Sequence, residues 1–382
     1  METQQSHILE LSEALQPFLE ELYERFLPHR EGSLSSTLPE FAVSDADKFG
    51  LCAITVDGAI YSVGDWDTPF TIQSISKPFV FGMALEKIAD NTNNFMASQL
   101  GYEPTGAAYD SVLLHEDIQR GLWNPMVNAG ALATTSLIPG SAFDDKHARL
   151  QHTFATYTTK SPRIDGDMYR FKRKNDHQNR AHAYWMLSAG VMDSPIEEVL
   201  DLYFRQCSLL ADCRDLAAMA ATWANAGTNP LTGKQAISEK HIKRLLSVMY
   251  MCGMYDFSGQ WAYRVGLPAK SGLTGCILMV VPNVMGIAVY SPRLDNNAKS
   301  ARGVLVCEEI SRHFQLHPFN NTKIDFSHTQ EKGKVVFQLK PYIEKLEELI
   351  EKPSPSKPTK KTSANAFQTI LERVHKENRG IH

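Results

Sequence analysis

The sequence predicts an α+β fold in which an antiparallel sheet is built from both ends of the chain. Near the N-terminus, strand-like residues 49–63 contain the turn pair Asp57-Gly58, which is typical of a β-hairpin. Strand-like segments return at 262–265, 269–273, 276–282 and 284–291. A block of helical spacing separates the two groups. A sheet with flanking helices and a mostly helical subdomain follows from this order.

The helices are predicted from apolar residues that recur every three or four positions. An amphipathic helix at 8–26 opens the chain, and another follows a strand-like segment that begins at Phe70. The helix at 301–314 is expected to pack on the sheet. Asp193, Asp212 and Ser238 are expected to cap helices of the middle block. The predicted helices span 8–26, 79–88, 181–190, 195–209, 213–226, 238–251 and 301–314.

The domain organisation predicted is a main domain at 1–319 and an extension at 320–382. The extension contains a short helix near 342–350, and the Pro- and Lys-rich linker after it is expected to be mobile and extended. A last amphipathic helix closes the chain. No chemistry is expected from the extension.

Composition excludes several functional classes. The chain has 382 residues and a formal net charge of −4, which is unlike the basic footprint of a nucleic-acid-binding protein. No apolar run is long enough to span a bilayer, and the acidic N-terminus lacks the apolar region of a signal peptide. Six scattered cysteines without a CxxC pair predict buried free thiols rather than disulfides or a metal site. A cytoplasmic location follows.

Ser74 and Lys77 form an S-x-x-K arrangement at the expected start of a helix. Residues three apart share a helix face, so the serine hydroxyl and the lysine amine can approach each other. A buried lysine has a lowered pKa and can take the proton of a serine nucleophile. The motif alone is weak, because a helix cap followed by a surface lysine gives the same pattern.

A second element strengthens this interpretation. Lys270-Ser271-Gly272 lies on an expected strand, and serine β-lactamases and penicillin-binding proteins combine S-x-x-K with such a K-[T/S]-G segment. The strand edge supplies a backbone N–H to an oxyanion hole, and the N–H of Ser74 supplies the other. Together the two motifs favour an enzyme that forms a serine acyl intermediate.

Longer blocks resemble the serine-dependent glutaminases, which share the β-lactamase-like fold. The blocks occur in family order over roughly residues 25–318. They are Phe70-Thr-Ile-Gln-Ser-Ile-Ser-Lys, Asn124-Pro-Met-Val-Asn-Ala-Gly-Ala, Asp201-Leu-Tyr-Phe, Cys252-Gly-Met-Tyr-Asp-Phe-Ser-Gly, Gly266-Leu-Pro-Ala-Lys-Ser-Gly and Val281-Pro-Asn-Val-Met-Gly. The resemblance implies hydrolysis of L-glutamine to L-glutamate and ammonia, without metal or organic cofactor, by a homodimer or homotetramer.

The resemblance also implies roles for individual residues. Ser74 is the expected nucleophile, Lys77 its base, and Tyr255 a phenol that relays the proton to the departing ammonia. Leu273, where the family has valine, supplies an oxyanion N–H. The residues expected to bind substrate are Ser74, Asn128, Lys172, Asn179, Tyr203, Tyr255 and Leu273. Without the resemblance, the favoured interpretations are that Asn128 caps a helix or bonds a turn backbone and that Tyr203 is a core residue.

Lys172 departs from the family, which has a glutamate there that is expected to hold the substrate's α-ammonium. Gln178 likewise replaces an arginine. A lysine repels an ammonium, so three explanations compete. Another carboxylate, from Asp165, Asp167 or Asp176, takes over the role; the enzyme is weak on glutamine; or the substrate is an ω-amide that lacks an α-ammonium.

The sequence is also compatible with two other functional classes. The first is a penicillin-recognising enzyme, against which the absence of a signal peptide argues, because its substrates lie outside the membrane. The second is a non-catalytic binding protein that retains the fold, which the altered segment around Lys172 would allow. Ammonia release by wild type and by Ser74→Ala separates an amidohydrolase from a binding protein, and a chromogenic β-lactam tests the first class.

Overall fold

The computed structural model divides into two units, Met1–Asn320 and Asn321–His382. The residues that the structure describes are 2–88, 100–108, 111, 123–192 and 195–320. The second unit lies outside them. The expected extension, its helices and its linker therefore remain predictions, as does the domain boundary at residue 319.

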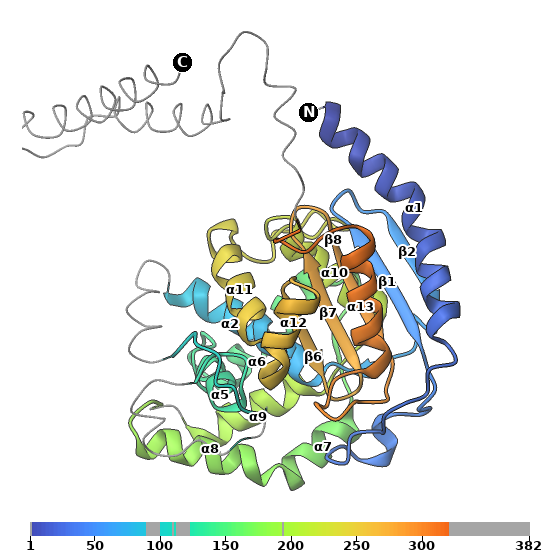
Figure 1. Ribbon diagram of the computed structural model, residues 1–382. Helices are drawn as coiled ribbons and strands as arrows, with labels where there is room; N and C mark the ends of the chain where they lie inside the picture. Colours follow the sequence, from blue (N-terminus) through green and yellow to red (C-terminus); the bar gives the residue numbers. More distant parts are fainter. Residues whose placement is uncertain (1, 89–99, 109–110, 112–122, 193–194, 321–382) are drawn as a thin grey trace, which may run out of the picture. The chain divides into compact units, whose positions relative to one another are not determined.

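A five-stranded antiparallel sheet forms the centre of the first unit (Figure 1). The strands run in the order β2-β1-β8-β7-β6. Because β1 pairs with β8, the N-terminal hairpin joins the C-terminal strands in one sheet, and the prediction of a sheet built from both ends is confirmed. The strands are β1 (Gly50–Thr55), β2 (Ile60–Gly64), β6 (Ala269–Gly272), β7 (Cys276–Val281) and β8 (Met285–Tyr290).

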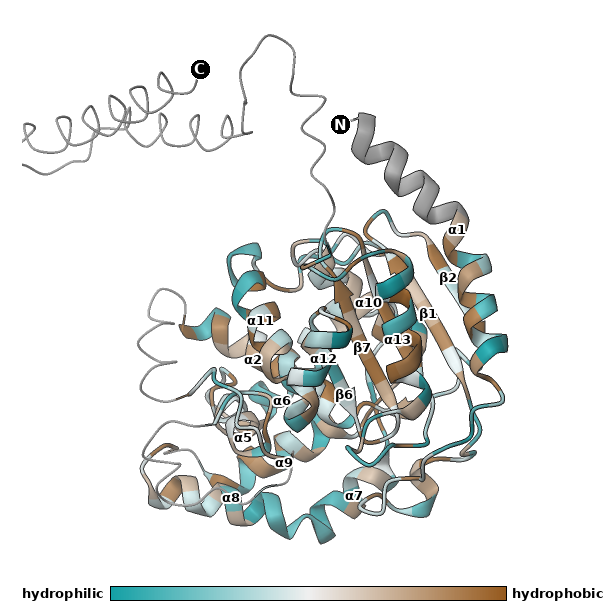
Figure 2. Ribbon diagram, viewed as in Figure 1, coloured by the Kyte–Doolittle hydropathy of each residue, from teal (hydrophilic) through white to brown (hydrophobic). Residues whose placement is uncertain are grey.

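Both faces of this sheet are buried. Successive side chains of a strand point to opposite faces, so Leu51 belongs to one hydrophobic core and Cys52 to the other. Helices α1 (Glu2–Phe26) and α13 (Ala301–His313) pack on the first face, and α10 (Cys213–Ala224) covers the second. Strand β7 is consequently apolar at every position, as its brown colour in Figure 2 shows.

Helix α10 approaches the sheet closely at Gly286 of β8. A Cβ atom at this position would lie 2.1 Å from the backbone nitrogen of Ala221, so only glycine fits. The helix begins at a capping box in which the Asp212 side chain accepts from the Asp215 N–H and the Asp215 side chain accepts in return. The predicted cap at Asp212 is confirmed. Ser238 precedes α11, but its side chain makes no capping hydrogen bond, and Asp193 lies outside the described residues.

A mostly helical block lies beside the sheet. Helix α5 packs against both α2 and α9, and α11 packs against α2. The predicted middle helices correspond to α8–α11. The helices of the block are α2 (Ser76–Ile88), α5 (Asn128–Ser136), α6 (Phe143–Tyr157), α7 (Gly166–Asn175), α8 (His177–Ser188), α9 (Ile196–Cys207) and α11 (Glu239–Cys252).

A small second sheet connects this block to the segment that carries the S-x-x-K motif. Its order is β3-β5-β4, formed by β3 (Phe70–Thr71), β4 (Arg163–Ile164) and β5 (Leu209–Ala211). Phe70 pairs with Ala211, and Arg163 pairs with Leu210. The chain that leads to Ser74 is therefore fixed to the C-terminal end of α9 before α2 begins.

The expected strand at 262–265 is wrong. These residues belong to the end of helix α12 (Ser258–Arg264) and its C-cap. Trp261 is fully buried and donates its indole N–H to the Leu267 carbonyl at 2.7 Å, and Gly266, at φ 70°, ends the helix with its N–H bonded to the Trp261 carbonyl. A four-residue apolar run carries no period that distinguishes a strand from a helix end.

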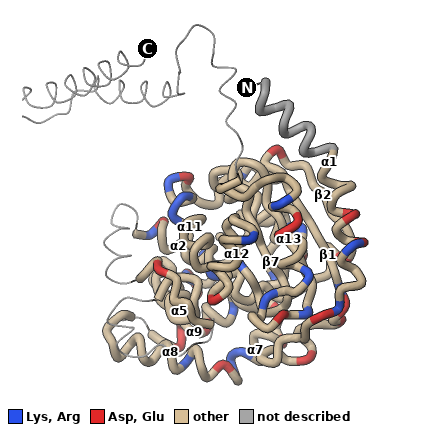
Figure 3. Tube along the Cα trace, viewed as in Figure 1, with Lys and Arg blue, Asp and Glu red and all other residues tan. Residues whose placement is uncertain are grey.

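The cysteine thiols of the chain are shielded from solvent. All six cysteines are buried and unpaired, as predicted. In the part of the chain that the structure describes, no helix has the length and apolarity needed to cross a membrane. Figure 3 shows Lys and Arg interspersed with Asp and Glu along the trace, without a segregated basic face in that view.

Candidate active site

Ser74 lies in a short 3₁₀ turn, η2 (Gln73–Ile75), between β3 and α2. The sequence places the S-x-x-K motif at the start of a helix, and α2 begins two residues after Ser74, at Ser76. Gln73 adopts a left-handed φ of 46°, a costly conformation for a side chain that is not glycine. Its amide donates to Thr71 Oγ1 at 2.7 Å, which holds the turn. Within the described residues, Ser74 Oγ makes no hydrogen bond to another protein group, and it faces a pocket.

Lys77 is completely buried in the first turn of α2. Its amine donates to Asn128 Oδ1 at 2.6 Å and to the Tyr255 hydroxyl at 3.2 Å. The pKa of Lys77 is lowered to about 7, chiefly by burial, and the positive charge of Lys172 contributes to this lowering. A large share of this amine is therefore neutral near pH 7 and able to accept a proton.

Tyr255 opens the 3₁₀ turn η4 (Tyr255–Phe257) with a left-handed φ of 58°. Three lysine amines surround its ring: Lys270 Nζ is 3.8 Å from the centroid, Lys77 Nζ 5.2 Å and Lys299 Nζ 5.4 Å. Lys299 also pairs with Asp256 at 3.4 Å. Burial holds the pKa of Lys270 well below its usual range, helped by the charges of Lys77 and Lys299. The phenol therefore lies in a buried environment among amines whose pKa values are lowered.

The end of strand β6 packs directly on the turn that carries Ser74. A Cβ atom on Gly272 would lie 3.2 Å from the Ile72 carbonyl oxygen, and Thr274 Oγ1 donates to the Thr71 carbonyl at 2.9 Å. Leu273, between these two residues, lines the same pocket as Ser74. The structure thus brings together two motifs almost two hundred residues apart.

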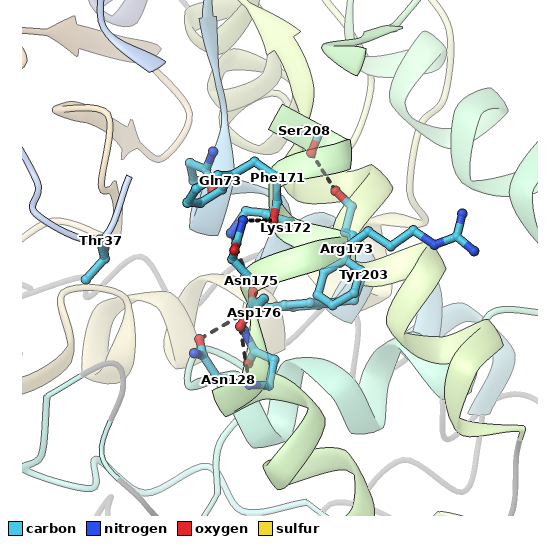
Figure 4. Close-up of polar contacts among 12 residues, drawn as sticks. Thr37, Gln73, Asn128, Phe171, Lys172, Arg173, Asn175, Asp176, Tyr203 and Ser208 are labelled. Atoms are coloured by element: carbon cyan, nitrogen blue, oxygen red, sulfur yellow. Dashed lines mark hydrogen bonds and ion pairs between the residues drawn. The ribbon is translucent and has the colours of Figure 1, made fainter. Parts of the chain in front are cut away.

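Other polar residues that the sequence singles out line the same pocket. The Tyr203 hydroxyl donates to Asn128 Oδ1 at 3.4 Å, and Figure 4 shows these two side chains close to Lys172 and Asp176. Of the eight predicted site residues, six line this pocket: Ser74, Asn128, Lys172, Asn179, Tyr203 and Leu273. Lys77 and Tyr255 adjoin it through hydrogen bonds among Asn128, Lys77 and Tyr255.

Among the three carboxylates offered in place of the family's glutamate, only Asp176 lines this pocket. Asp165 instead caps α7, accepting from the Met168 N–H at 2.7 Å. Asp167 is exposed and pairs with Arg170 on the outer side of α7. The structure therefore removes Asp165 and Asp167 from consideration.

Some residues near the site have no recognisable signal in the sequence. Lys299 reaches the Tyr255 ring from a distant loop and pairs with Asp256, and nothing in their spacing predicts these contacts. The described residues contain no group of three or more His, Cys, Asp or Glu side chains placed to hold a metal ion. That the chain needs no cofactor stays a prediction.

Comparison with known proteins identifies the family of this chain. The family model for glutaminase matches residues 32–319. The chain belongs to the glutaminase family. The family's members are amidohydrolases, and this glutaminase family protein is therefore an enzyme of that class.

Individual relatives agree with this assignment. A glutaminase from Trichormus variabilis is 48% identical over 307 residues, which cover 80% of this chain and 91% of the relative. A solved structure of the probable glutaminase YbaS has a TM-score of 0.76 and 35% identity, covering 80% of this chain and 98% of the other. A probable glutaminase from Bacillus subtilis, solved with 6-diazo-5-oxo-L-norleucine, has a TM-score of 0.71 and 29% identity, covering 80% and 97%. The predicted β-lactamase-like fold, an antiparallel sheet flanked by helices, is confirmed.

Proposed function

We propose that this protein hydrolyses L-glutamine to L-glutamate and ammonia through an acyl-enzyme on Ser74. The observation that carries the proposal is the buried Lys77 amine, whose pKa is lowered to about 7 and which is bonded to Asn128 in the pocket that Ser74 lines. A serine needs such a base before its hydroxyl can attack an amide. The names of the relatives support glutamine as the substrate.

The first half of the reaction forms an ester. Ser74 Oγ attacks the side-chain amide carbon, and its proton passes to the neutral amine of Lys77. The backbone N–H groups of Ser74 and Leu273 stabilise the oxyanion. Tyr255, hydrogen-bonded to Lys77, relays the proton to the amide nitrogen, the C–N bond breaks and ammonia leaves.

The second half reverses the proton path. A water molecule attacks the ester carbonyl while Lys77 takes one of its protons. The same two N–H groups stabilise the second oxyanion. The ester bond to Ser74 breaks, the proton returns to Ser74 Oγ, and L-glutamate is released.

A second candidate is an ω-amidase whose substrate lacks an α-ammonium. The observation that favours it is that Lys172 lines the pocket, because a lysine attracts a carboxylate or keto oxygen and repels an ammonium. Rates of ammonia release from L-glutamine, L-asparagine, 2-oxoglutaramate and succinamate distinguish the two. A preference for 2-oxoglutaramate or succinamate would replace the first candidate by the second.

The acyl-enzyme is tested with 6-diazo-5-oxo-L-norleucine, an electrophilic glutamine analogue. Intact-mass spectrometry of the wild type is expected to give a single adduct, which peptide mapping places on Ser74. Ser74→Ala should give no adduct and lose ammonia release, while Ser76→Ala, two residues away and buried at the start of α2, serves as the matched control for adduct formation. Undiminished ammonia release by Ser74→Ala would remove the mechanism.

The proposal also covers the cellular location and the oligomeric state of the enzyme. We infer a cytoplasmic location, which the six buried free thiols support, and a homodimer or homotetramer. Light scattering coupled to size exclusion measures the assembly directly. A monomer at micromolar concentration would contradict it.

A further inference from the structure

Lys172 and Asp176 form an ion pair inside the pocket. They lie one helical turn apart, Lys172 in the last turn of α7 and Asp176 at the junction of α7 and α8. Lys172 Nζ is 3.7 Å from Asp176 Oδ2, and each side chain is only 15% exposed. Figure 4 shows both beside Tyr203 and Asn128, within the pocket that Ser74 also lines.

This pair makes the charged lining of the pocket neutral as a whole. Lys172 is the only Lys or Arg among the described lining residues, and Asp176 the only Asp or Glu. A mostly buried charge is costly without a partner, and complementary charges decide which ligands are rejected. An amino-acid head group carries one ammonium and one carboxylate, so it matches the two side chains with none left over. A substrate that carries a carboxylate but no ammonium would leave the Asp176 carboxylate without a positively charged group of the ligand to face.

Asn179 adds an acceptor at the Asp176 side of the pocket. Its side-chain amide donates to both carboxylate oxygens of Asp176 at 2.8 Å. This contact fixes the orientation of the amide, because the reversed one would place its oxygen against a carboxylate. Asn179 Oδ1 is buried without a hydrogen-bond partner among the described residues. Native proteins rarely leave such an acceptor unpaired, and a ligand ammonium supplies the missing donor.

We propose that Lys172 and Asp176 together select the zwitterionic head group of an α-amino acid. Lys172 binds the α-carboxylate, while the Asp176 carboxylate and Asn179 Oδ1 bind the α-ammonium. The proposal rests on the proposed function and deepens it. Where the family has a glutamate, this chain has Lys172, and Asp176 one helical turn away supplies the carboxylate that binds the ammonium. L-Glutamine is selected over ω-amides without the ammonium.

Three substrates that differ by one charged group test this assignment. L-Glutamine carries both groups, glutaramate lacks the ammonium, and 4-aminobutanamide lacks the carboxylate. The wild type is expected to prefer glutamine over each truncated amide by about 10- to 100-fold in kcat/KM, since a site built for a polar group rejects analogues without it.

Two conservative variants separate the roles. Asp176→Asn is expected to raise KM for glutamine about tenfold or more while leaving glutaramate unchanged or improved. Lys172→Gln should raise KM for glutamine and for glutaramate alike, and it should leave KM for 4-aminobutanamide unchanged. Asn keeps the helix cap that Asp176 supplies to α8. The exposed Asp167–Arg170 pair on the same helix provides the matched control, and Asp167→Asn should change none of these rates.

Binding measurements keep this inference separate from the chemistry. In a Ser74→Ala background, calorimetry should show L-glutamate binding more tightly than glutarate, with the difference lost in Asp176→Asn. If no amide releases ammonia but this difference persists, the proposed reaction fails and the head-group assignment stands. If the wild type prefers glutaramate, or Asp176→Asn weakens glutamate and glutarate equally, the assignment is overturned.

Discussion

Lys77 Nζ and Asn128 Oδ1, 51 residues apart in sequence, are joined by a hydrogen bond of 2.6 Å in the interior of the protein. The contact joins the first turn of α2 to the first residue of α5. It gives a buried amine an acceptor that carries no charge, so the lysine is oriented without being held as an ammonium. A carboxylate in place of the amide would favour the protonated form and remove the base.

The acid limb of the pH profile of kcat/KM should follow the ionisation of the Lys77 amine. Its pKa is lowered to about 7 by burial, and the neutral amine is the active form, so kcat/KM is expected to rise with pH through about 7. The charge of Lys172 lowers this pKa and that of Asp176 raises it. Lys172→Gln should therefore move the limb to higher pH, and Asp176→Asn to lower pH.

The control variant for that pH profile must leave the groups around Lys77 unchanged. Charged or titratable neighbours come from α9, η4 and β6, namely Cys207, Tyr255 and Lys270. Asp167→Asn, on the exposed side of α7, should leave the limb in place. Shifts of the same sign in both pocket variants would contradict the assignment of the limb to Lys77.

Removing the phenol oxygen should affect turnover more than binding. Tyr255→Phe keeps the ring against the Lys270 amine but loses the hydroxyl that accepts from Lys77. We expect kcat to fall about 100-fold or more, the usual cost of losing a proton-transfer group, with KM little changed. Tyr203→Phe removes a hydroxyl whose bond to Asn128 is 3.4 Å long, and its effect on kcat should be smaller. Equal losses in the two variants would remove the relay role.

Leu273 is expected to act through its backbone and not its side chain. Leu273→Val keeps the N–H and should stay within about twofold of the wild type in kcat. Leu273→Pro removes the N–H and should lower kcat about 100- to 1,000-fold, as loss of one oxyanion donor does. Calorimetric binding of L-glutamate, retained in the proline variant, shows that the turn is intact. Full activity of a folded proline variant would exclude this N–H from the oxyanion hole.

Two glycines allow a matched test of the packing of α10 on the sheet. Gly286→Ala would place a Cβ atom 2.1 Å from the Ala221 nitrogen, and we expect a loss of about 3 kcal/mol in the free energy of unfolding or failure to fold. Gly259, inside α12, has open space around it, so Gly259→Ala should stabilise by about 0.5–1 kcal/mol. Urea unfolding measures both. A stable Gly286→Ala would mean that α10 lies farther from β8.

The sequence predicts most of the elements because their patterns are local. The Asp57-Gly58 turn between two apolar runs gives the hairpin, and the Asp212 cap gives the start of α10, as the structure confirms. The run at 262–265 is misassigned because four residues are too few to show a period, and the tertiary contact of Trp261 decides their conformation. The start of α2 moves past Ser74 because the left-handed Gln73 imposes a tighter turn.

By itself, the sequence determined the α+β class, the S-x-x-K and K-S-G motifs and the resemblance to glutaminases, because each depends on residues that are close neighbours along the chain. Tertiary structure alone decided that Asp176, and neither Asp165 nor Asp167, shares the pocket with Lys172. It also decided the lowered pKa of Lys77 and the ring of lysines around Tyr255. The physical reason is that burial and charge–charge distance depend on how helices and strands pack, and spacing along the chain does not encode either.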